Sequence, residues 1–184
     1  MKSGQLASFQ RVRLATAVTI VLVTAGSSAA IFGLCAWFGV RINMSASLPV
    51  GLYSITTGNS ASLVEFCLAG PFAALSLRRG YRDRGTCEDG GAPLLKPLVA
   101  VAGDVVQLSA RGISVNGVLV RNTAPLSKDT KGRPLKAWPC GRYRVAPGTV
   151  WVASSYQPRS FDSRYFGPIS TATIRHRLKP FLTR

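Results

Sequence analysis

The amino-acid sequence predicts a mainly β fold, an antiparallel β domain carried on an N-terminal transmembrane helix. Residues 14–40 contain no charged side chain and are predominantly apolar, a stretch long enough to cross a bilayer as a helix. Residues 41–184 instead alternate short apolar runs with turns rich in Gly, Pro and Asn, which is typical of strands. Within them, Asn116-Gly117 separates two apolar runs and predicts a hairpin with a type I′ turn.

The charges that flank the apolar stretch predict its orientation. The basic residues before it are Lys2, Arg11 and Arg13, whereas a single basic residue follows it before Glu65. The positive-inside bias therefore predicts a cytoplasmic segment 1–13, a single-pass anchor 14–40 in the inner membrane and an exported, periplasmic domain 41–184. A cleaved signal peptide is the alternative, because residues 25–30 are mostly small. The apolar run exceeds the usual signal-peptide core of about 7–15 residues, which favours a retained anchor.

After the anchor, the expected elements follow from the apolar runs and the turns between them. The expected strands are residues 52–56, 63–69, 94–102, 105–108, 149–153 and 169–174, with the hairpin at 113–120. Residues 72–79 can form a helical turn or two, whereas 81–93 and 156–167 are rich in turn-forming residues and are expected as loops. Residues 122–136 are polar and are expected to be a mobile loop. No internal repeat or low-complexity segment interrupts this order.

The strong positive charge bears on possible partners. The formal net charge is +16, but the basic residues are scattered rather than gathered with interleaved aromatic residues, which disfavours a nucleic-acid partner. A location next to anionic lipid headgroups explains the same positive charge, because each basic residue near the headgroups adds about 1 kcal/mol of attraction. The densest basic group, residues 175–179, is expected to be a solvated tail. Membrane lipid is therefore the favoured partner of the basic surface.

Four cysteines allow one disulfide outside the membrane segment. Cys35 lies in the predicted anchor. Cys87 and Cys140 both lie in turn-like segments and are the expected disulfide pair, which an oxidising exterior permits. Cys67 lies in an apolar run and is expected to be a buried thiol. No spacing of Cys and His resembles a zinc site, so no metal or cofactor is expected.

Candidate catalytic residues are a serine and a lysine. The sole histidine, His176, lies in the basic tail, which disfavours a Ser–His–Asp triad. Lys96 interrupts an apolar run, and burial lowers the pKa of a lysine enough for it to act as a general base. The alternative for Lys96 is a lysine on an edge strand with its amine in solvent. Ser47 follows the predicted anchor and is either a nucleophile or a linker residue. Asp162 can form an ion pair with Arg164 or an ordinary Asx turn.

Three segments in order carry a resemblance to a known family. They are Ser-Leu-Pro-Val-Gly-Leu-Tyr (47–53), Leu-Lys-Pro-Leu-Val-Ala-Val-Ala-Gly-Asp (95–104) and Ser-Phe-Asp-Ser-Arg-Tyr-Phe-Gly (160–167). Together they resemble the three motif boxes of the type I signal peptidase family, serine–lysine proteases with an antiparallel β domain on an N-terminal anchor. The Asn-x-Ser-x-Ser-Leu-Pro form of the first segment is most similar to the TraF branch, the conjugative-transfer peptidases of plasmids.

The resemblance implies roles for the matching residues. Ser47 matches the nucleophile, and Lys96 matches the neutral amine that takes its proton. Ser45 matches the side chain that helps the Ser47 N–H to bind the oxyanion, and Ser160 matches the hydroxyl that orients the lysine amine. The matched ion pair is Asp162 and Arg164, and in the TraF branch this aspartate is also proposed to be catalytic. Gly103 and Asp104 match the turn at the end of the motif segment that contains Lys96.

The implied function is a membrane-anchored serine endopeptidase that processes exported precursors. By resemblance, its expected client is the pilin precursor of a conjugative type IV secretion system, and its product is either a linear or a cyclic pilin. A general signal peptidase is the alternative enzyme, and a non-catalytic structural component of the conjugation apparatus is the alternative from another class. Leu48 stands where general signal peptidases usually have Met, which favours the conjugative branch.

Overall fold

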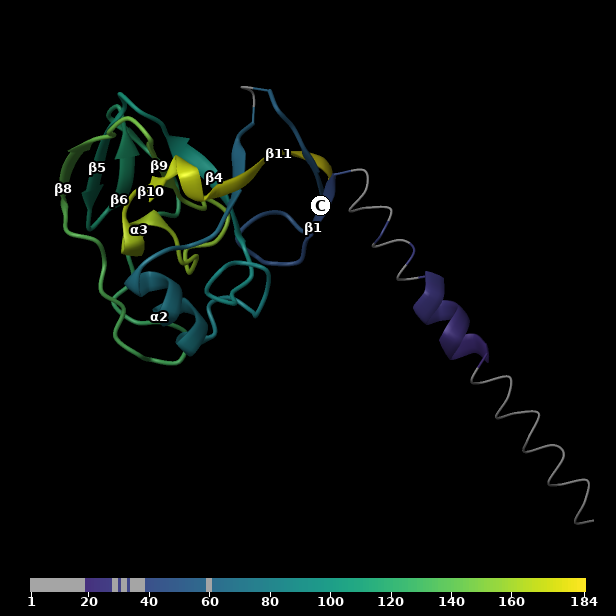
Figure 1. Cartoon of the computed structure of the whole chain (residues 1–184). Helices are drawn as coiled ribbons and strands as arrows, with labels where there is room; N and C mark the ends of the chain where they lie inside the picture. The colour runs from purple at the N-terminus through teal and green to yellow at the C-terminus, as the bar shows by residue number, and fades with distance from the viewer. Residues whose placement is uncertain (1–18, 28–29, 31–32, 34–38, 59–60) are drawn as a thin grey trace, which may run out of the picture. The chain divides into compact units, whose positions relative to one another are not determined.

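The chain divides into two units, residues 1–41 and 42–184. The computed structural model in Figure 1 describes residues 19–27, 30, 33, 39–58 and 61–184. In the first unit, residues 19–27 are helical. No helix within the described residues has the length and apolar character needed to cross a membrane. Most of the predicted anchor 14–40 and the whole of the predicted cytoplasmic segment 1–13 lie outside the described residues.

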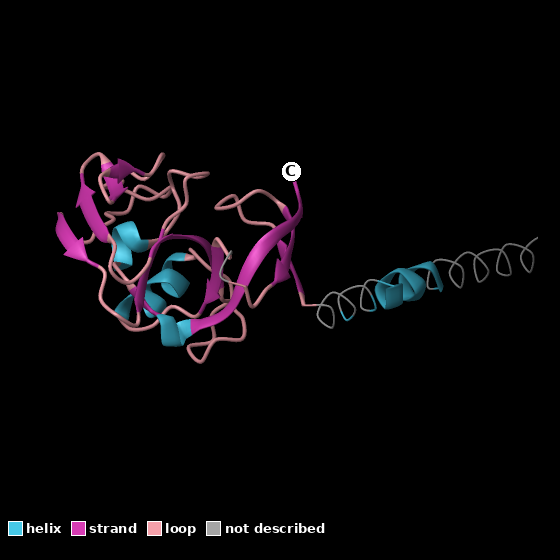
Figure 2. Cartoon of the chain, turned by 90° about the horizontal axis from the view of Figure 1, so that it is seen from above, coloured by secondary structure: helices cyan, strands magenta, loops and turns pink. Residues whose placement is uncertain are grey.

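The second unit is mainly β, as predicted (Figure 2). A seven-stranded sheet has the order β1-β2-β11-β3-β4-β9-β10, and a four-stranded sheet has the order β7-β6-β5-β8. The pairings within β2, β11, β3, β4, β9 and β10 and throughout the smaller sheet are antiparallel. The elements are β1 Val40–Asn43, β2 Gly51–Ile55, β3 Leu63–Phe66, α2 Pro71–Arg79, β4 Leu94–Ala100, β5 Val105–Ser109, β6 Gly112–Val115, β7 Val118–Leu119, β8 Gly141–Arg144, β9 Thr149–Val152, α3 Ser163–Phe166, β10 Ile169–Ser170, the 3₁₀ turn Thr171–Thr173 and β11 Ile174–Thr183.

The predicted hairpin is confirmed. Strands β6 and β7 pair through Val115 and Val118, and the two residues between them, Asn116 and Gly117, have φ angles of 50° and 87°. Positive φ at both positions defines the type I′ turn, which Asn and Gly adopt at low cost. The Asn116 side chain also accepts a hydrogen bond from the Val105 N–H at 2.9 Å, so the turn is fixed to β5.

The expectation for the C-terminal region was wrong. Residues 169–174 do not form one strand, and the basic group 175–179 is not a solvated tail but part of the ten-residue strand β11. This strand lies between β2 and β3 and pairs with both. Leu178 is the one buried residue of this strand. A strand with so little buried surface needs no regular alternation of apolar residues, and its sequence shows none. Backbone hydrogen bonds to two neighbouring strands stabilise β11 instead.

The predicted disulfide was also wrong. Cys67, expected as a free buried thiol, is bonded to Cys87, while Cys140 is an exposed free cysteine. Cys67 directly follows β3, and the loop after α2 returns Cys87 to a Cα–Cα distance of 5.6 Å, which suits a disulfide. Cys140 precedes β8, a strand of the smaller sheet.

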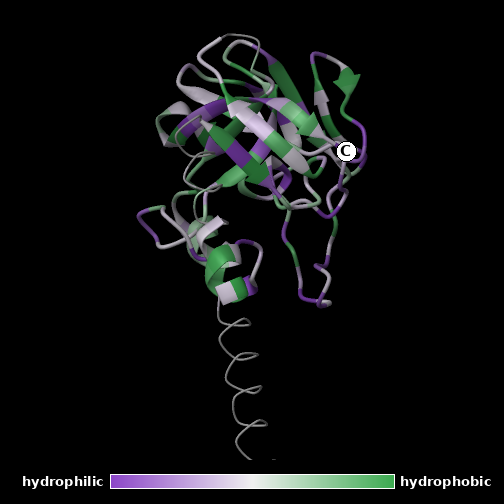
Figure 3. Ribbon diagram, turned by 90° about the vertical axis from the view of Figure 1, so that its right-hand side faces the viewer, coloured by the Kyte–Doolittle hydropathy of each residue, from purple (hydrophilic) through white to green (hydrophobic). Residues whose placement is uncertain are grey.

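Three apolar clusters hold the domain together and place the strands that carry the site, and the smallest of them joins Leu48 to Tyr53, Leu63 and Leu178. The first packs α2 and α3 against β3, β4 and β9, and its fully buried members include Val64, Phe66 and Val152. The second fills the space between β9 and the smaller sheet around Trp151. Hydrophobic and hydrophilic residues are interspersed along the strands (Figure 3). Strands β4 and β9 lie side by side in the larger sheet, so residues on β4 and in the loop after β9 can meet.

Candidate active site

The turn that carries Ser47 is shaped by Asn43, a buried residue at the end of β1. Its Nδ2 donates hydrogen bonds to the carbonyl oxygens of Ser45, Leu48 and Pro49 at 2.9, 3.3 and 3.1 Å. Its Oδ1 accepts from the N–H and the hydroxyl of Ser45 at 3.2 and 2.8 Å. One amide side chain therefore organises the whole turn. The Ser45 hydroxyl, expected to support an oxyanion, is bonded to Asn43 in this structure.

Ser47 and Lys96 are brought together by β4. The Lys96 Nζ lies 2.5 Å from the Ser47 Oγ, across 49 positions of sequence. Lys96 is 5% exposed and lies on an interior strand between β3 and β9, so it is not an edge-strand lysine with its amine in solvent. A neutral amine at this position can accept the hydroxyl proton, which is the geometry required of a general base.

Burial lowers the pKa of Lys96 from its ordinary 10.5 to about 8. The Asp162 carboxylate raises this pKa and the Arg164 guanidinium lowers it, and both effects are smaller than that of burial. The physical cause is the poor solvation of an ammonium group inside the protein. At neutral pH the amine consequently exists in both protonation states, which serves a base that must accept and then return a proton.

Asp162 and Arg164 form a fully buried ion pair in the third motif segment, both with 0% exposed side chains. The Asp162 Oδ1 accepts from the Arg164 N–H and Nε, and its Oδ2 accepts from Arg164 Nη2 at 2.8 Å. The guanidinium also donates to four backbone carbonyl oxygens, those of Asn122, Ala124, Pro158 and Ser160. These contacts fix the loop after β9 to the 122–124 segment. The carboxylate makes no hydrogen bond to Lys96 and affects it through charge alone.

Ser154 connects the ion pair to the turn of Ser47 and was not identified from the sequence. Its fully buried hydroxyl donates to the Ser47 carbonyl oxygen at 2.5 Å and accepts from the N–H groups of Tyr156 and Gln157 at 3.1 and 3.2 Å. Its own N–H donates to Asp162 Oδ2 at 3.1 Å. The backbone of Ser47 is thereby fixed to the third motif segment. The sequence carried no signal for this role, because the contact spans 107 positions.

Ser160, expected to orient the lysine amine, makes no hydrogen bond through its hydroxyl to Ser47 or Lys96. Its hydroxyl is buried and has no hydrogen-bond partner among the described residues. It nevertheless lines the same cavity as Ser47 and Lys96. An unpaired buried hydroxyl is costly, typically about 1–3 kcal/mol, and such groups in native proteins commonly have a functional reason.

The cavity beside Ser47 and Lys96 has a volume of about 170 Å³. Its remaining lining mixes apolar or aromatic residues with polar ones and comes from the turn of Ser47, the loop after α2, β4, residues 126–135, the loop after β9 and α3. This last segment lies within the region that the sequence indicated only as a polar, mobile loop. Here Lys128 and Pro134 form a β-bridge, and hydrogen bonds give the segment a defined course.

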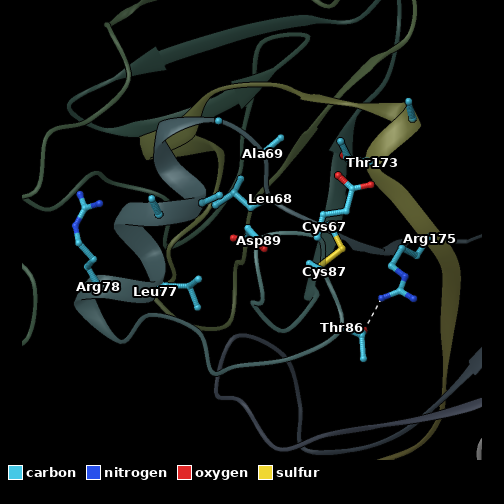
Figure 4. Close-up of a pocket in the computed structure, with 15 residues that line it drawn as sticks. Cys67, Leu68, Ala69, Leu77, Arg78, Thr86, Cys87, Asp89, Thr173 and Arg175 are labelled. Atoms are coloured by element: carbon cyan, nitrogen blue, oxygen red, sulfur yellow. Dashed lines mark hydrogen bonds between the residues drawn. A yellow bond between two sulfur atoms is a disulfide. The ribbon is translucent and has the colours of Figure 1, made fainter.

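A larger cavity of about 830 Å³ lies elsewhere and shares no lining residue with the first. Figure 4 shows that it is bordered by the Cys67–Cys87 disulfide, by Leu77 and Arg78 at the end of α2, and by Arg175 on β11. Its lining contains neither a serine nor a lysine. Size is therefore a poor guide to the chemistry of this protein, and the smaller cavity is the candidate active site.

Comparisons with known proteins show the family that the chain resembles over most of its length. A family model described as signal peptidase, peptidase S26, matches residues 11–182. The chain is 34% identical over 170 residues to the plasmid transfer protein TraF of Escherichia coli, and the match covers 90% of each chain. It is 39% identical over 145 residues to the probable conjugal transfer protein TraF of Sinorhizobium fredii, covering 76% of this chain and 75% of the relative. A signal peptidase I structure from Enterococcus faecalis matches at 21% identity and a TM-score of 0.37, covering 68% of this chain and 100% of that one.

Proposed function

Because the chain belongs to the signal peptidase family, peptidase S26, we propose that it is a membrane-anchored serine endopeptidase with Ser47 as nucleophile and Lys96 as general base. The family makes it a serine peptidase of the signal-peptidase type, with TraF proteins among its relatives. The observation that carries the proposal is the 2.5 Å approach of the Lys96 Nζ to the Ser47 Oγ. A buried amine and a hydroxyl at this distance can exchange a proton directly.

The proposed reaction begins with neutral Lys96. Its amine takes the Ser47 proton as the oxygen attacks the scissile carbonyl, and it later gives this proton to the leaving amine. The Ser47 N–H stabilises the oxyanion, and the Ser45 hydroxyl joins it by leaving Asn43. Such a donor is worth about 3 kcal/mol of barrier. The Ser160 hydroxyl receives a hydrogen bond from the protonated amine as Nζ moves away from Ser47.

Asp162 acts in this proposal as a supporting residue. Its carboxylate is bonded to Arg164 and to the Ser154 N–H, so neither oxygen is placed to take a proton from substrate. Its charge favours the ammonium form of Lys96 as the proton transfers. The buried pair also fixes the loop that lines the cavity.

The proposed substrate is an exported precursor of a conjugative transfer system, with a pilin precursor as the first candidate. The relatives are named for plasmid or conjugal transfer, which favours this client over general secretory precursors. The peptidase domain is proposed to lie in the periplasm, anchored by residues 14–40. Water or the amino terminus of the pilin itself can resolve the acyl-enzyme, giving a linear or a cyclic product.

Co-expression of the full-length chain with a candidate pilin precursor tests the proposal. The product mass should show cleavage, and a cyclic product should be one water lighter than the linear one. Ser47→Ala and Lys96→Ala should each abolish processing. Unchanged processing in either variant would favour a non-catalytic component of the apparatus, and equal processing of unrelated secretory precursors would favour a general signal peptidase.

A further inference from the structure

Residues 126–135 form one wall of the cavity that holds Ser47 and Lys96. The members of this wall are Leu126, Lys128, Asp129, Thr130 and Leu135. Leu126 and Leu135 present apolar surface, and the same cavity is also lined by Leu94 of β4 and by Phe161. A side chain that enters this space beside Ser47 must therefore contact the 126–135 segment.

Asp129 organises the wall from within. Its Oδ1 accepts hydrogen bonds from the N–H groups of Lys131 and Arg133 at 2.9 and 3.0 Å. Its Oδ2 accepts from the Tyr81 hydroxyl at 2.7 Å and from the Arg133 Nε at 2.6 Å. Burial would raise the pKa of Asp129, but the hydrogen bonds from Tyr81, Arg133 and Lys131 hold it well below its usual range. Four donors thus converge on one carboxylate.

The wall is also tied to the end of α2 and to α3. The Arg133 Nη2 donates to the Arg79 carbonyl oxygen at 2.9 Å, and the Arg79 Nη1 donates to the Pro134 carbonyl oxygen at 2.7 Å. At the other end, the Leu126 N–H donates to the Tyr165 hydroxyl oxygen at 3.0 Å. The segment has no helix or strand of its own, so these side-chain contacts determine where it lies.

We propose that Asp129 is a positioning residue that holds the 126–135 wall against the cavity, and that this wall selects the apolar side chain that the substrate places beside Ser47. The inference rests on the proposed function and adds to it a determinant of substrate choice. A cavity of about 170 Å³ is below the range of roughly 300–1,000 Å³ of small-molecule sites. It suits one side chain of an extended peptide, with Leu126 and Leu135 limiting its size.

The test measures kcat and KM separately for the full-length protein in detergent. The probes are internally quenched peptides matched to the precursor junction that wild type cleaves, with Ala, Val, Leu or Phe immediately before the scissile bond. Asp129→Asn removes the carboxylate charge, and Asp129→Glu retains it. Leu135→Ala enlarges the cavity without removing any of the hydrogen bonds to the Asp129 carboxylate. Lys136→Ala is the matched control, because Lys136 is exposed, directly follows the segment and does not line the cavity.

Asp129→Asn should raise KM about tenfold with kcat within about twofold, because it weakens substrate binding without altering Ser47 or Lys96. Asp129→Glu should recover part of this loss. Leu135→Ala should shift the preference by about tenfold towards Leu or Phe, since one or two methylene groups in an apolar pocket are worth about that much. Lys136→Ala should match wild type.

Unchanged KM in Asp129→Asn together with an unchanged side-chain preference in Leu135→Ala would overturn the inference while leaving the proposed function standing. Thermal unfolding is followed for each variant, and if Asp129→Asn does not fold, the Leu135→Ala preference decides. Absence of cleavage by wild type itself would overturn the proposed function and the inference with it.

Discussion

Replacing Lys96 with Met should abolish cleavage and, at neutral pH, stabilise the fold. The Lys96 pKa is about 8 in the folded protein and 10.5 as the reference value. Between these values the unfolded chain binds more protons than the folded one, so the stability of wild type rises with pH. Below pH 8 the folded state bears the full cost of burying the ammonium group. This cost disappears as the pH approaches 10.5, the pKa taken for the lysine in the unfolded chain.

The magnitude follows from the two pKa values. Each unit of difference corresponds to about 1.4 kcal/mol, so wild type should gain roughly 2–3 kcal/mol of unfolding free energy between pH 7 and pH 10 from this residue. Lys96 is 5% exposed, so solvent screening does not reduce this value much. Lys96→Met should lack this rise, and its advantage over wild type should be largest at pH 7.

The assay is urea unfolding of the full-length protein in detergent at several pH values, followed by tryptophan fluorescence. Ser47→Ala is the matched control, because it is inactive but retains the lysine and should show the same pH-dependent stability as wild type. The unfolding free energies of wild type and Lys96→Met are compared between pH 7 and pH 10. A constant difference across this range would refute the reasoning, since it would mean that the lysine has the same pKa in the folded and unfolded states.

The remaining predictions concern the pH profile, the disulfide and the turn of Ser47. Wild-type kcat/KM should rise about tenfold between pH 7 and pH 9 and then level off, because the neutral fraction of Lys96 rises through a pKa of about 8; a flat profile would contradict a lysine base. Peptide mapping of oxidised protein should find Cys67 linked to Cys87 and Cys140 alkylated without reduction, and a Cys87–Cys140 peptide would contradict the structure. Ser154→Ala should lower kcat about tenfold with little change in KM, because one hydrogen bond to the Ser47 carbonyl is worth about 1 kcal/mol or slightly more; a change confined to KM would argue for a role in binding instead.

Local sequence patterns predicted much of the fold and the candidate site. Asn116-Gly117 specified its turn because the φ angles depend on those two residues alone. The lysine within an apolar run predicted a buried amine, and Lys96 is buried on β4 as expected. The three motif segments indicated a similarity to TraF peptidases, and the relatives confirm this similarity.

Features that depend on distant contacts were missed or misread. The basic residues of β11 gave no apolar alternation, because pairing with β2 and β3 holds the strand in place. Disulfide connectivity cannot be read from spacing, since three cysteines outside the predicted anchor leave several pairings open. Asn43 and Ser154 are ordinary polar residues in the sequence and acquire their roles only when their hydrogen-bond partners are brought to them.

The sequence alone determined the residue types on which the proposed chemistry depends, a serine and a lysine within recognisable motifs, because composition and short-range pattern are local properties. Only the tertiary structure decided that the Ser47 hydroxyl and the Lys96 amine lie 2.5 Å apart, and that residues 126–135 close one side of their cavity. Those relations arise from sheet order and from side-chain hydrogen bonds between segments far apart in the chain. Such contacts leave no periodic signal in the residues that make them.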